Sequence, residues 1–263
     1  MSKKRYLRTS DLAKAADVHP NTVRLYEQWG LLPPVERDPF NGYRRFEQAH
    51  LDQMLLIRRA MRFNWLSGVI RTTTYDVMHQ GAAGDLGGAL ELAYRLVSLV
   101  QAERAQAEAA VQYLRRWVEG VLPDSTSSTK RIGAVARLLD VTIDQIRNWE
   151  RNGLIDVPRN PSNGYRLFGP REIGRLRVIR MLLKSRYSMM AVLRMMNKLD
   201  AGETEMLREA LDTPEPEEDI LYATDHWLTS LTQLEQDAGD LVAQVEMNLT
   251  KQSLQESDSR LSS

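Results

Sequence analysis

Two stretches of the chain carry apolar residues at alternating spacings of four and three, which predict long amphipathic helices. The first covers residues 86–121, where Arg104 interrupts the apolar row, and the second covers residues 217–249, where Glu235 interrupts it. The first row is Leu86, Leu90, Ala93, Val97, Val100, Ala107, Val111, Leu114, Val118 and Val121. The second row is Leu228, Leu231, Ala238, Val242, Val245 and Leu249, with Trp227, Leu234 and Leu241 beside it. These rows predict that the two helices pair as a coiled coil.

Shorter elements precede each long helix. Near the N-terminus, Pro20 suits the first position of a short helix and Gly30 suits its end. Extended segments at residues 35–37 and 43–46 flank Asn41-Gly42, a pair that favours a hairpin because both residues tolerate positive φ. The pattern predicts a helix, a turn, a second helix, a small β-wing and a further helix.

The same order of elements recurs later in the chain. Placing Asp17-Val18 over Asp140-Val141, an offset of 123, also aligns Gly30-Leu31 with Gly153-Leu154. The offset further aligns Arg24 with Arg147 and Glu27 with Glu150. After one deletion the wing residues Asn41 to Arg44 match Asn163 to Arg166. A match of this length indicates duplication of one structural unit.

The repeated stretches VHPNTVRLYEQWGLLPP…NGYRRF and VTIDQIRNWERNGLID…NGYRLF resemble the winged helix-turn-helix of the MerR family of bacterial transcription regulators. The resemblance covers about residues 1–75 and 129–200. It implies a mainly α fold with small β-wings, in which each of two winged helix-turn-helix domains is followed by a long helix. In this family such helices pair as an antiparallel coiled coil, which agrees with the two apolar rows.

Charge is unevenly distributed, although the formal net charge is zero. Residues 1–75 carry a net +6 and residues 129–200 a net +9, whereas residues 76–128 carry −3 and residues 201–263 carry −12. Both basic blocks coincide with the repeated motif. A basic block of this kind is a candidate face for binding a polyanion such as double-stranded DNA.

The first turn of a recognition helix must present short polar side chains to base edges in the major groove. The candidates are His19, Asn21 and Thr22 in the first repeat and Thr142, Asp144 and Gln145 in the second. Asparagine and glutamine can pair with adenine, whereas Asp144 can accept from cytosine but repels phosphate. The two first turns differ at every base-facing position, so we expect an asymmetric operator.

Other candidates suit the DNA backbone. Arg24 and Arg147 can contact phosphate or guanine, and Tyr26 and Trp149 fit either a backbone contact or the domain core. In the wings, phosphate contacts are expected from Arg37, Tyr43, Arg44, Arg159, Tyr165 and Arg166. Together with the base-facing residues, these side chains make up the predicted DNA-binding surface.

The pattern predicts six segments. They are a first winged helix-turn-helix domain (1–75), a hinge and long coiled-coil helix (76–122), a linker (123–128), a second winged domain (129–200), an acidic connector with the second long helix (201–254) and a frayed tail (255–263). The linker reaches at most about 20 Å, enough for the chain to fold back on itself. We therefore expect a monomeric pseudo-dimer, with a homodimer as the alternative.

Several function classes are excluded or disfavoured. The chain has no cysteine, which excludes thiolate metal sites and cysteine nucleophiles, and it shows no catalytic constellation, so we expect neither an enzyme nor a cofactor. No apolar run approaches the roughly 20 residues of a membrane span, and we expect a cytoplasmic, nucleoid-associated protein. The first hypothesis is a transcription regulator that distorts promoter DNA, with RNA polymerase as a further partner implied by the resemblance. The second is an architectural or protein-interaction adaptor in which only one winged domain binds DNA.

Overall fold

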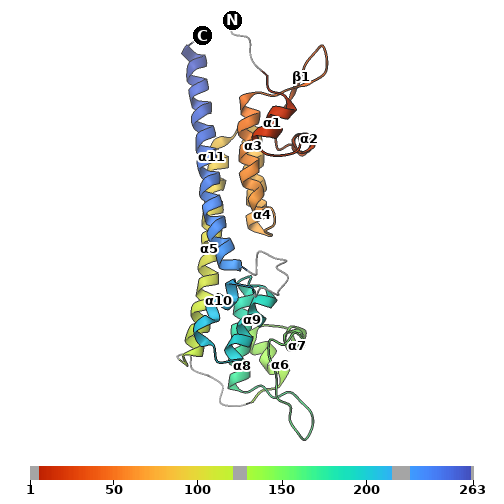
Figure 1. Cartoon of the computed structure of the whole chain (residues 1–263), viewed down its shortest axis with the longest axis vertical. Helices are drawn as coiled ribbons and strands as arrows, with labels where there is room; N and C mark the ends of the chain where they lie inside the picture. The colour runs from red at the N-terminus through yellow and green to blue at the C-terminus, as the bar shows by residue number, and fades with distance from the viewer. Residues whose placement is uncertain (1–5, 121–128, 215–225, 262–263) are drawn as a thin grey trace. The chain divides into compact units, whose positions relative to one another are not determined.

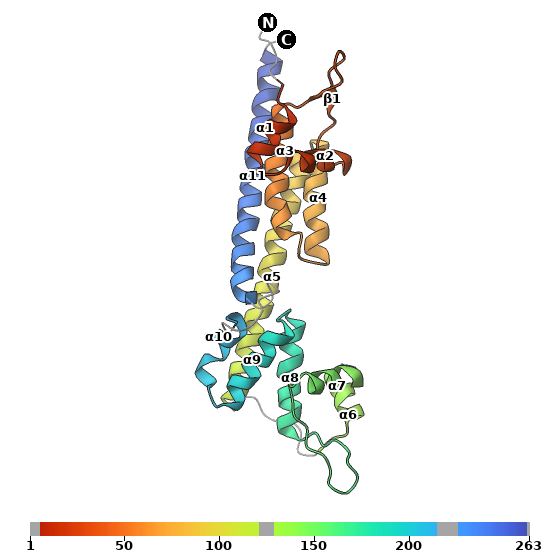
Figure 2. The ribbon, with the colours of Figure 1, turned by 45° about the vertical axis from the view of Figure 1, so that its right-hand side comes forward.

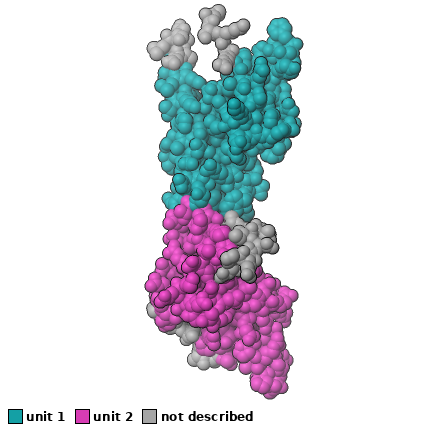
Figure 3. All heavy atoms as spheres, viewed as in Figure 1, with its two compact units in different colours: residues 1–101, 233–263 teal, residues 102–232 magenta. Residues whose placement is uncertain are grey.

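The computed structural model describes residues 6–120, 129–214 and 226–261, which are mainly helical (Figure 1). The chain divides into two compact units (Figure 3). Unit 1 comprises residues 1–101 and 233–263, and unit 2 comprises residues 102–232. The predicted linker 123–128 lies outside the described residues, as do residues 215–225 of the predicted acidic connector. Each unit contains one helix-turn-helix and a part of each long helix.

Unit 1 begins with a winged helix-turn-helix. Its elements are α1 (Thr9–Ala15), α2 (Pro20–Gln28), β1 (Glu36–Arg37), β2 (Arg44–Arg45), α3 (Gln48–Ala60), the 3-10 turn η1 (Met61–Phe63) and α4 (Val69–Ala83). The strands β1 and β2 pair antiparallel, with Glu36 opposite Arg45 and Arg37 opposite Arg44. The wing connects α2 to α3, so the recognition helix and the wing belong to one continuous segment.

Unit 2 repeats this order. Its elements are α6 (Ile132–Leu139), α7 (Ile143–Arg151), α8 (Pro170–Lys184), α9 (Met189–Asp200), the 3-10 turn η2 (Thr204–Met206) and α10 (Leu207–Asp212) (Figure 2). A single antiparallel bridge between Arg159 and Arg166 takes the place of the paired strands. Asp17 and Asp140 both have φ +50°, so the turn between the first two helices has the same left-handed residue in both repeats.

The long helices are α5 (Leu86–Val118) and α11 (Trp227–Leu261). Residues 76–83, assigned to the predicted hinge segment, continue helix α4, which ends at Gly84 with φ +81°. Only Gly84 and Asp85 separate α4 from α5. At the other end of the chain, residues 255–261 of the predicted frayed tail continue helix α11.

Within unit 1 the two long helices pair antiparallel. Tyr94 Oη donates to Glu246 Oε1 at 2.8 Å, and Gln101 Nε2 donates to Glu235 Oε1 at 3.1 Å. Because the partner's number falls as the residue number rises, the helices run in opposite directions. This confirms the antiparallel coiled coil expected from the sequence.

The buried row of α5 differs in part from the predicted one. Ala93, Val100, Ala107 and Leu114 are buried as expected, but the other buried residues of the row are Ala89, Leu96 and Ala110. The predicted Leu90, Val97 and Val111 are only half-buried. The buried row therefore combines small alanines with the larger Leu96, Val100 and Leu114, and alanine lets neighbouring helices approach closely.

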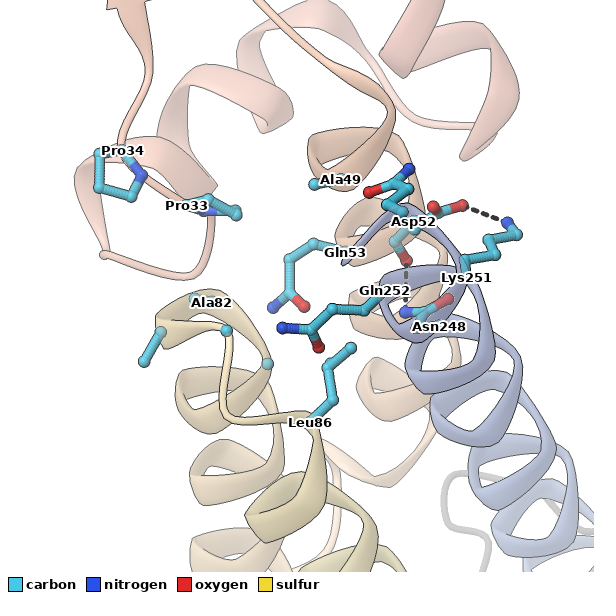
Figure 4. A pocket seen from close by; sticks show the side chains of 14 residues that line it. Pro33, Pro34, Ala49, Asp52, Gln53, Ala82, Leu86, Asn248, Lys251 and Gln252 are labelled. Carbon is cyan, nitrogen blue, oxygen red and sulfur yellow. Dashed lines mark hydrogen bonds and ion pairs between the residues drawn. The ribbon is translucent and has the colours of Figure 1, made fainter. Parts of the chain in front are cut away.

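Helix α11 has a polar row in addition to its two apolar rows, and this row faces α3. Lys251 Nζ donates to Asp52 Oδ1 at 2.6 Å, and Asn248 Nδ2 donates to the Asp52 carbonyl oxygen at 3.3 Å (Figure 4). Further along the helix, Arg59 Nε donates to Gln244 Oε1 at 3.2 Å, and Arg62 pairs with Asp237. The apolar rows of α11 are buried except for Leu249, which is half-buried, while its polar row fixes α3 and η1 to the long helix.

Candidate nucleic-acid interface

The recognition helices α2 and α7 each bury one side and expose the opposite one. Val23 and Ile146, at matched positions, are fully buried. On the opposite side α2 presents an outer row at the spacing i, i+3, i+4 and i+7, consisting of Asn21, Arg24, Leu25 and Gln28, all exposed. The matched row of α7 is Asp144, Arg147, Asn148 and Arg151, with Asn148 half-buried and the others exposed. Each helix therefore has one continuous face that is largely exposed to solvent.

Several predicted base-facing residues cap their own helix. His19 Nδ1 accepts the backbone N–H of Asn21 at 3.2 Å. Thr142 Oγ1 accepts the N–H of Gln145 at 3.0 Å, while Gln145 Oε1 accepts the N–H of Thr142 at 2.8 Å. Capping occupies these acceptors, so the Nε2 atoms of His19 and Gln145 are the atoms left for an outside partner.

Each outer row also contains a short internal pair. Arg24 Nη1 donates to Asn21 Oδ1 at 3.1 Å, and Arg147 Nη1 donates to Asp144 Oδ1 at 3.3 Å. Thr22, the third predicted base-facing residue of α2, lies half-buried beside the row. Because Arg147 partly neutralises Asp144, the repulsion of phosphate expected from this aspartate is reduced.

In the first repeat, one glutamate of the recognition helix binds two wing arginines. Glu27 Oε1 accepts from Arg37 Nη2 at 2.9 Å, and Glu27 Oε2 accepts from Arg44 Nε at 2.5 Å. The Glu27 side chain is 18% exposed, so this contact is largely shielded from solvent. The two arginines, predicted only as phosphate ligands, thus also hold the wing against α2.

The second repeat has the same contact. Glu150 accepts from Arg166 Nε at 3.0 and 2.7 Å, and Arg159 Nη2 lies 3.9 Å from Glu150 Oε1. Sequence reasoning missed the role of both glutamates, although the alignment of Glu27 with Glu150 and of Arg44 with Arg166 was a signal for it. We call this arrangement the glutamate clamp.

We expect the substitution Glu150→Gln to weaken DNA binding about fivefold, because a neutral amide holds two guanidinium groups less firmly and the wing loses its orientation. If only net charge mattered, the same substitution would strengthen DNA binding, because it removes a negative charge from the proposed DNA-binding face. Titration of a labelled duplex measures the effect. The matched control is Asp156→Asn, which removes the same charge from an exposed side chain of unit 2. A gain in affinity for both variants would contradict the clamp.

The predicted aromatic contacts fall into two groups. Tyr43 and Tyr165 are 74% and 62% exposed on their wings, as a backbone contact requires. Tyr26 is half-buried, and burial raises the pKa of its phenol. Trp149 is only 5% exposed and packs in the core of the second helix-turn-helix. The assignment of Trp149 to the DNA-binding surface is therefore corrected, because a buried indole ring cannot reach a phosphate.

A basic cleft in unit 2 adds two residues that the sequence analysis did not single out. It has a volume of about 860 Å³ and lies between α6, α7 and the wing. Arg131, which is the N-cap residue of α6, and Arg137 of α6 line it together with Arg147 and Arg159. The Arg131 guanidinium lies 5.7 Å from the Tyr165 ring centroid. Arg131 and Arg137 align with Arg8 and Lys14 at the offset of 123, so the repeat itself contained a signal for them.

The described residues contain no group of three or more histidine, aspartate and glutamate side chains that could hold a metal ion. None of the helices in the described part of the chain combines the length and the apolar character that a bilayer crossing requires.

Comparisons with known proteins agree with this geometry. The family described as "MerR HTH family regulatory protein" matches residues 7–68 and 130–199, which contain the two winged helix-turn-helix segments. The HTH-type transcriptional regulator CueR of Escherichia coli O6:H1 is 41% identical over 51 residues, 19% of this chain and 37% of that protein. CueR of Vibrio cholerae serotype O1 (strain ATCC 39541 / Classical Ogawa 395 / O395) is 42% identical over 53 residues, 20% of this chain and 37% of that protein. The chain thus spans little more than a third of these relatives, and no solved structure matches it.

Proposed function

Since this chain belongs to the MerR family of helix-turn-helix regulatory proteins, we propose that it is a sequence-specific DNA-binding transcription regulator. The observation that supports this most strongly is the presence of two recognition helices in one chain, each with an exposed outer row and a wing held by a glutamate clamp. Both helices belong to segments with a positive net charge, as a polyanion-binding face requires.

We further propose that the protein acts as a single-chain pseudo-dimer. Within unit 1 the antiparallel pair is formed by α5 and α11 of the same chain. The apolar residues Leu234, Leu241 and Val245 of α11 are at most 3% exposed in the monomer. A second chain is therefore not needed to cover these side chains, which favours the monomer over the homodimer.

The operator in this proposal is asymmetric, because the two outer rows share only the arginine pair Arg24 and Arg147. A homodimer presents identical helices and requires a palindrome, whereas this chain presents two different ones. We propose distortion of promoter DNA on the same basis, because two linked domains can impose their own spacing on deformable DNA. In this proposal RNA polymerase binds the promoter in its distorted form.

A footprint on a duplex selected from random sequence tests the proposal. We expect two protected half-sites of unequal sequence, with centres about 10 base pairs or a multiple of that apart. The alternative is an architectural or protein-interaction adaptor in which only one winged domain binds DNA. The second domain, whose outer row contains Asp144, then binds protein or only the DNA backbone. Weak binding without sequence preference and with a steep salt dependence would overturn the regulator proposal and support the adaptor.

A further inference from the structure

The outer rows of α2 and α7 differ in chemistry as well as in sequence. In α2 the arginine Arg24 is accompanied by two carboxamides, Asn21 and Gln28, and by Leu25, whose side chain is 38% exposed. In α7 the matched arginine is accompanied by a carboxylate, a carboxamide and a second arginine. The difference lies on the face that would meet base edges, so it bears on which sequences are selected.

The row of α2 suits A·T base pairs. Asparagine and glutamine side chains can make two hydrogen bonds to adenine, through its N6 and N7 atoms. An exposed leucine costs solvation free energy unless it meets another apolar group, and the C5-methyl of thymine is the apolar group of the major groove. Gln28 has no hydrogen-bond or ion-pair partner among the described residues, so its amide remains available for a base.

The row of α7 suits G·C base pairs. Arg151 occupies the position of Gln28, and arginine pairs with the O6 and N7 atoms of guanine. Asp144 occupies the position of Asn21 and can accept from the N4 amino group of cytosine. Asn148, at the position of Leu25, accepts from Asn152 Nδ2 at 3.1 Å, so its carbonyl oxygen is already engaged within the helix. Asn21 Oδ1 is engaged in the same way by Arg24 Nη1 at 3.1 Å. The contrast between the two rows therefore rests on Leu25 and Gln28 against Asp144 and Arg151, not on the asparagines.

We propose that the two recognition helices select half-sites of different base composition: α2 selects A·T pairs through Leu25 and Gln28, and α7 selects G·C pairs through Asp144 and Arg151. Leu25, Gln28 and Arg151 are then specificity-determining residues beyond those of the first helical turn. This inference rests on the proposed sequence-specific DNA binding and specifies what each half-site contains.

The test is selection of duplexes from a randomised pool by the full-length protein and by a variant that carries the second row on the first helix, Leu25→Asn with Gln28→Arg. Since the chain has no cysteine, one cysteine at a wing tip can carry a DNA-cleaving reagent that assigns each half-site to its domain. Suitable positions are Phe40→Cys, 95% exposed, and Ser162→Cys, also exposed.

For the unaltered protein we expect A·T enrichment in the half-site cleaved from position 40 and G·C enrichment in the half-site cleaved from position 162. In the double variant the first half-site changes its preference toward G·C by about tenfold, while the second half-site is unchanged. The control Ala105→Arg adds the same positive charge on exposed α5, and we expect it to leave the base preference of both half-sites unaltered.

Two failures can be told apart. If the unaltered protein enriches no sequence, the proposed function itself fails. If it enriches two half-sites that have the same composition, or if the double variant retains the original preference, sequence-specific binding stands and the division between α2 and α7 is wrong. Intact folding of the variant, checked by circular dichroism, ensures that a retained or altered preference reflects the outer row.

Discussion

Replacing Trp149 by alanine is expected to unfold the second helix-turn-helix under conditions in which the first remains folded. The indole is 5% exposed, and Ile146 and Phe168 of the same repeat are fully buried. Truncating a buried tryptophan to alanine costs about 3–5 kcal/mol, and a small domain has only about 5–15 kcal/mol of stability in total. Amide hydrogen exchange resolves the effect, because protection should fall in α6 and α7 and persist in α1 and α2.

The matched control is Tyr26→Ala at the corresponding position of the first repeat. Tyr26 is half-buried, so its loss should reduce protection in α1 and α2 clearly less than Trp149→Ala reduces it in α6 and α7. Trp149→Phe, which keeps an apolar ring in the core, should restore most of the protection. If Trp149→Ala instead left the exchange pattern unchanged and lowered only DNA affinity, the indole would be a DNA contact and the assignment to the core would be wrong.

Removing two arginines of the basic cleft, with Arg131→Ala and Arg137→Ala together, is expected to lower the salt dependence of DNA binding. Each lost phosphate contact reduces the slope of log K against log salt by about 0.9, so the double variant should lose about 2. Affinity should fall by about one to two orders of magnitude at low salt, and by less at high salt, because released counterions supply most of this free energy. Titrations at several salt concentrations measure both quantities.

The control is the pair Arg115→Ala and Arg116→Ala, which removes the same charge from exposed positions of α5. We expect this control to change affinity slightly and to leave the slope close to that of the unaltered protein. Equal slopes for the two double variants would mean that Arg131 and Arg137 act only through the net charge of unit 2, and the basic cleft would not be a phosphate-binding site.

The fold was largely predictable because it is encoded in local patterns repeated within the chain. The offset of 123 defined two copies of one unit, and the apolar rows of α11 marked its buried faces correctly except at Leu249, which is half-buried. The centre of the α5 row was less predictable. A periodicity argument favours large apolar residues, whereas Ala89 and Ala110 are buried and the predicted Leu90 and Val111 are only half-buried.

The sequence predicted which types of residue make up the candidate site. It predicted less well what each side chain contacts in the structure. Arg44 and Arg166 were expected to contact phosphate, but charge alone does not show that each also binds a glutamate of its own recognition helix. The polar row of α11, from Asp237 to Lys251, was missed for a similar reason. Its partners lie in α3 and η1, 175 to 199 residues away in the sequence, and only tertiary structure brings them together.

Aromatic residues at matched positions show the same limit. Tyr26 and Trp149 align in the repeat, yet one is half-buried and the other is in the core. Sequence reasoning left both roles open for both residues, because an aromatic side chain next to a glutamate suits a DNA backbone contact as well as a domain core. Burial, which depends on the packing of each copy, decided the matter for Trp149.

The central claim, that one chain supplies both DNA-binding domains of a regulator, is tested most directly by the mass of its complex with a selected duplex in solution. Sedimentation equilibrium measures this mass for the free protein and for the protein with DNA. We predict 30.1 kDa for the free chain and a complex of one chain with one duplex. Two chains on each duplex, together with a free protein of twice the chain mass, would contradict the claim and identify a homodimer with four winged domains.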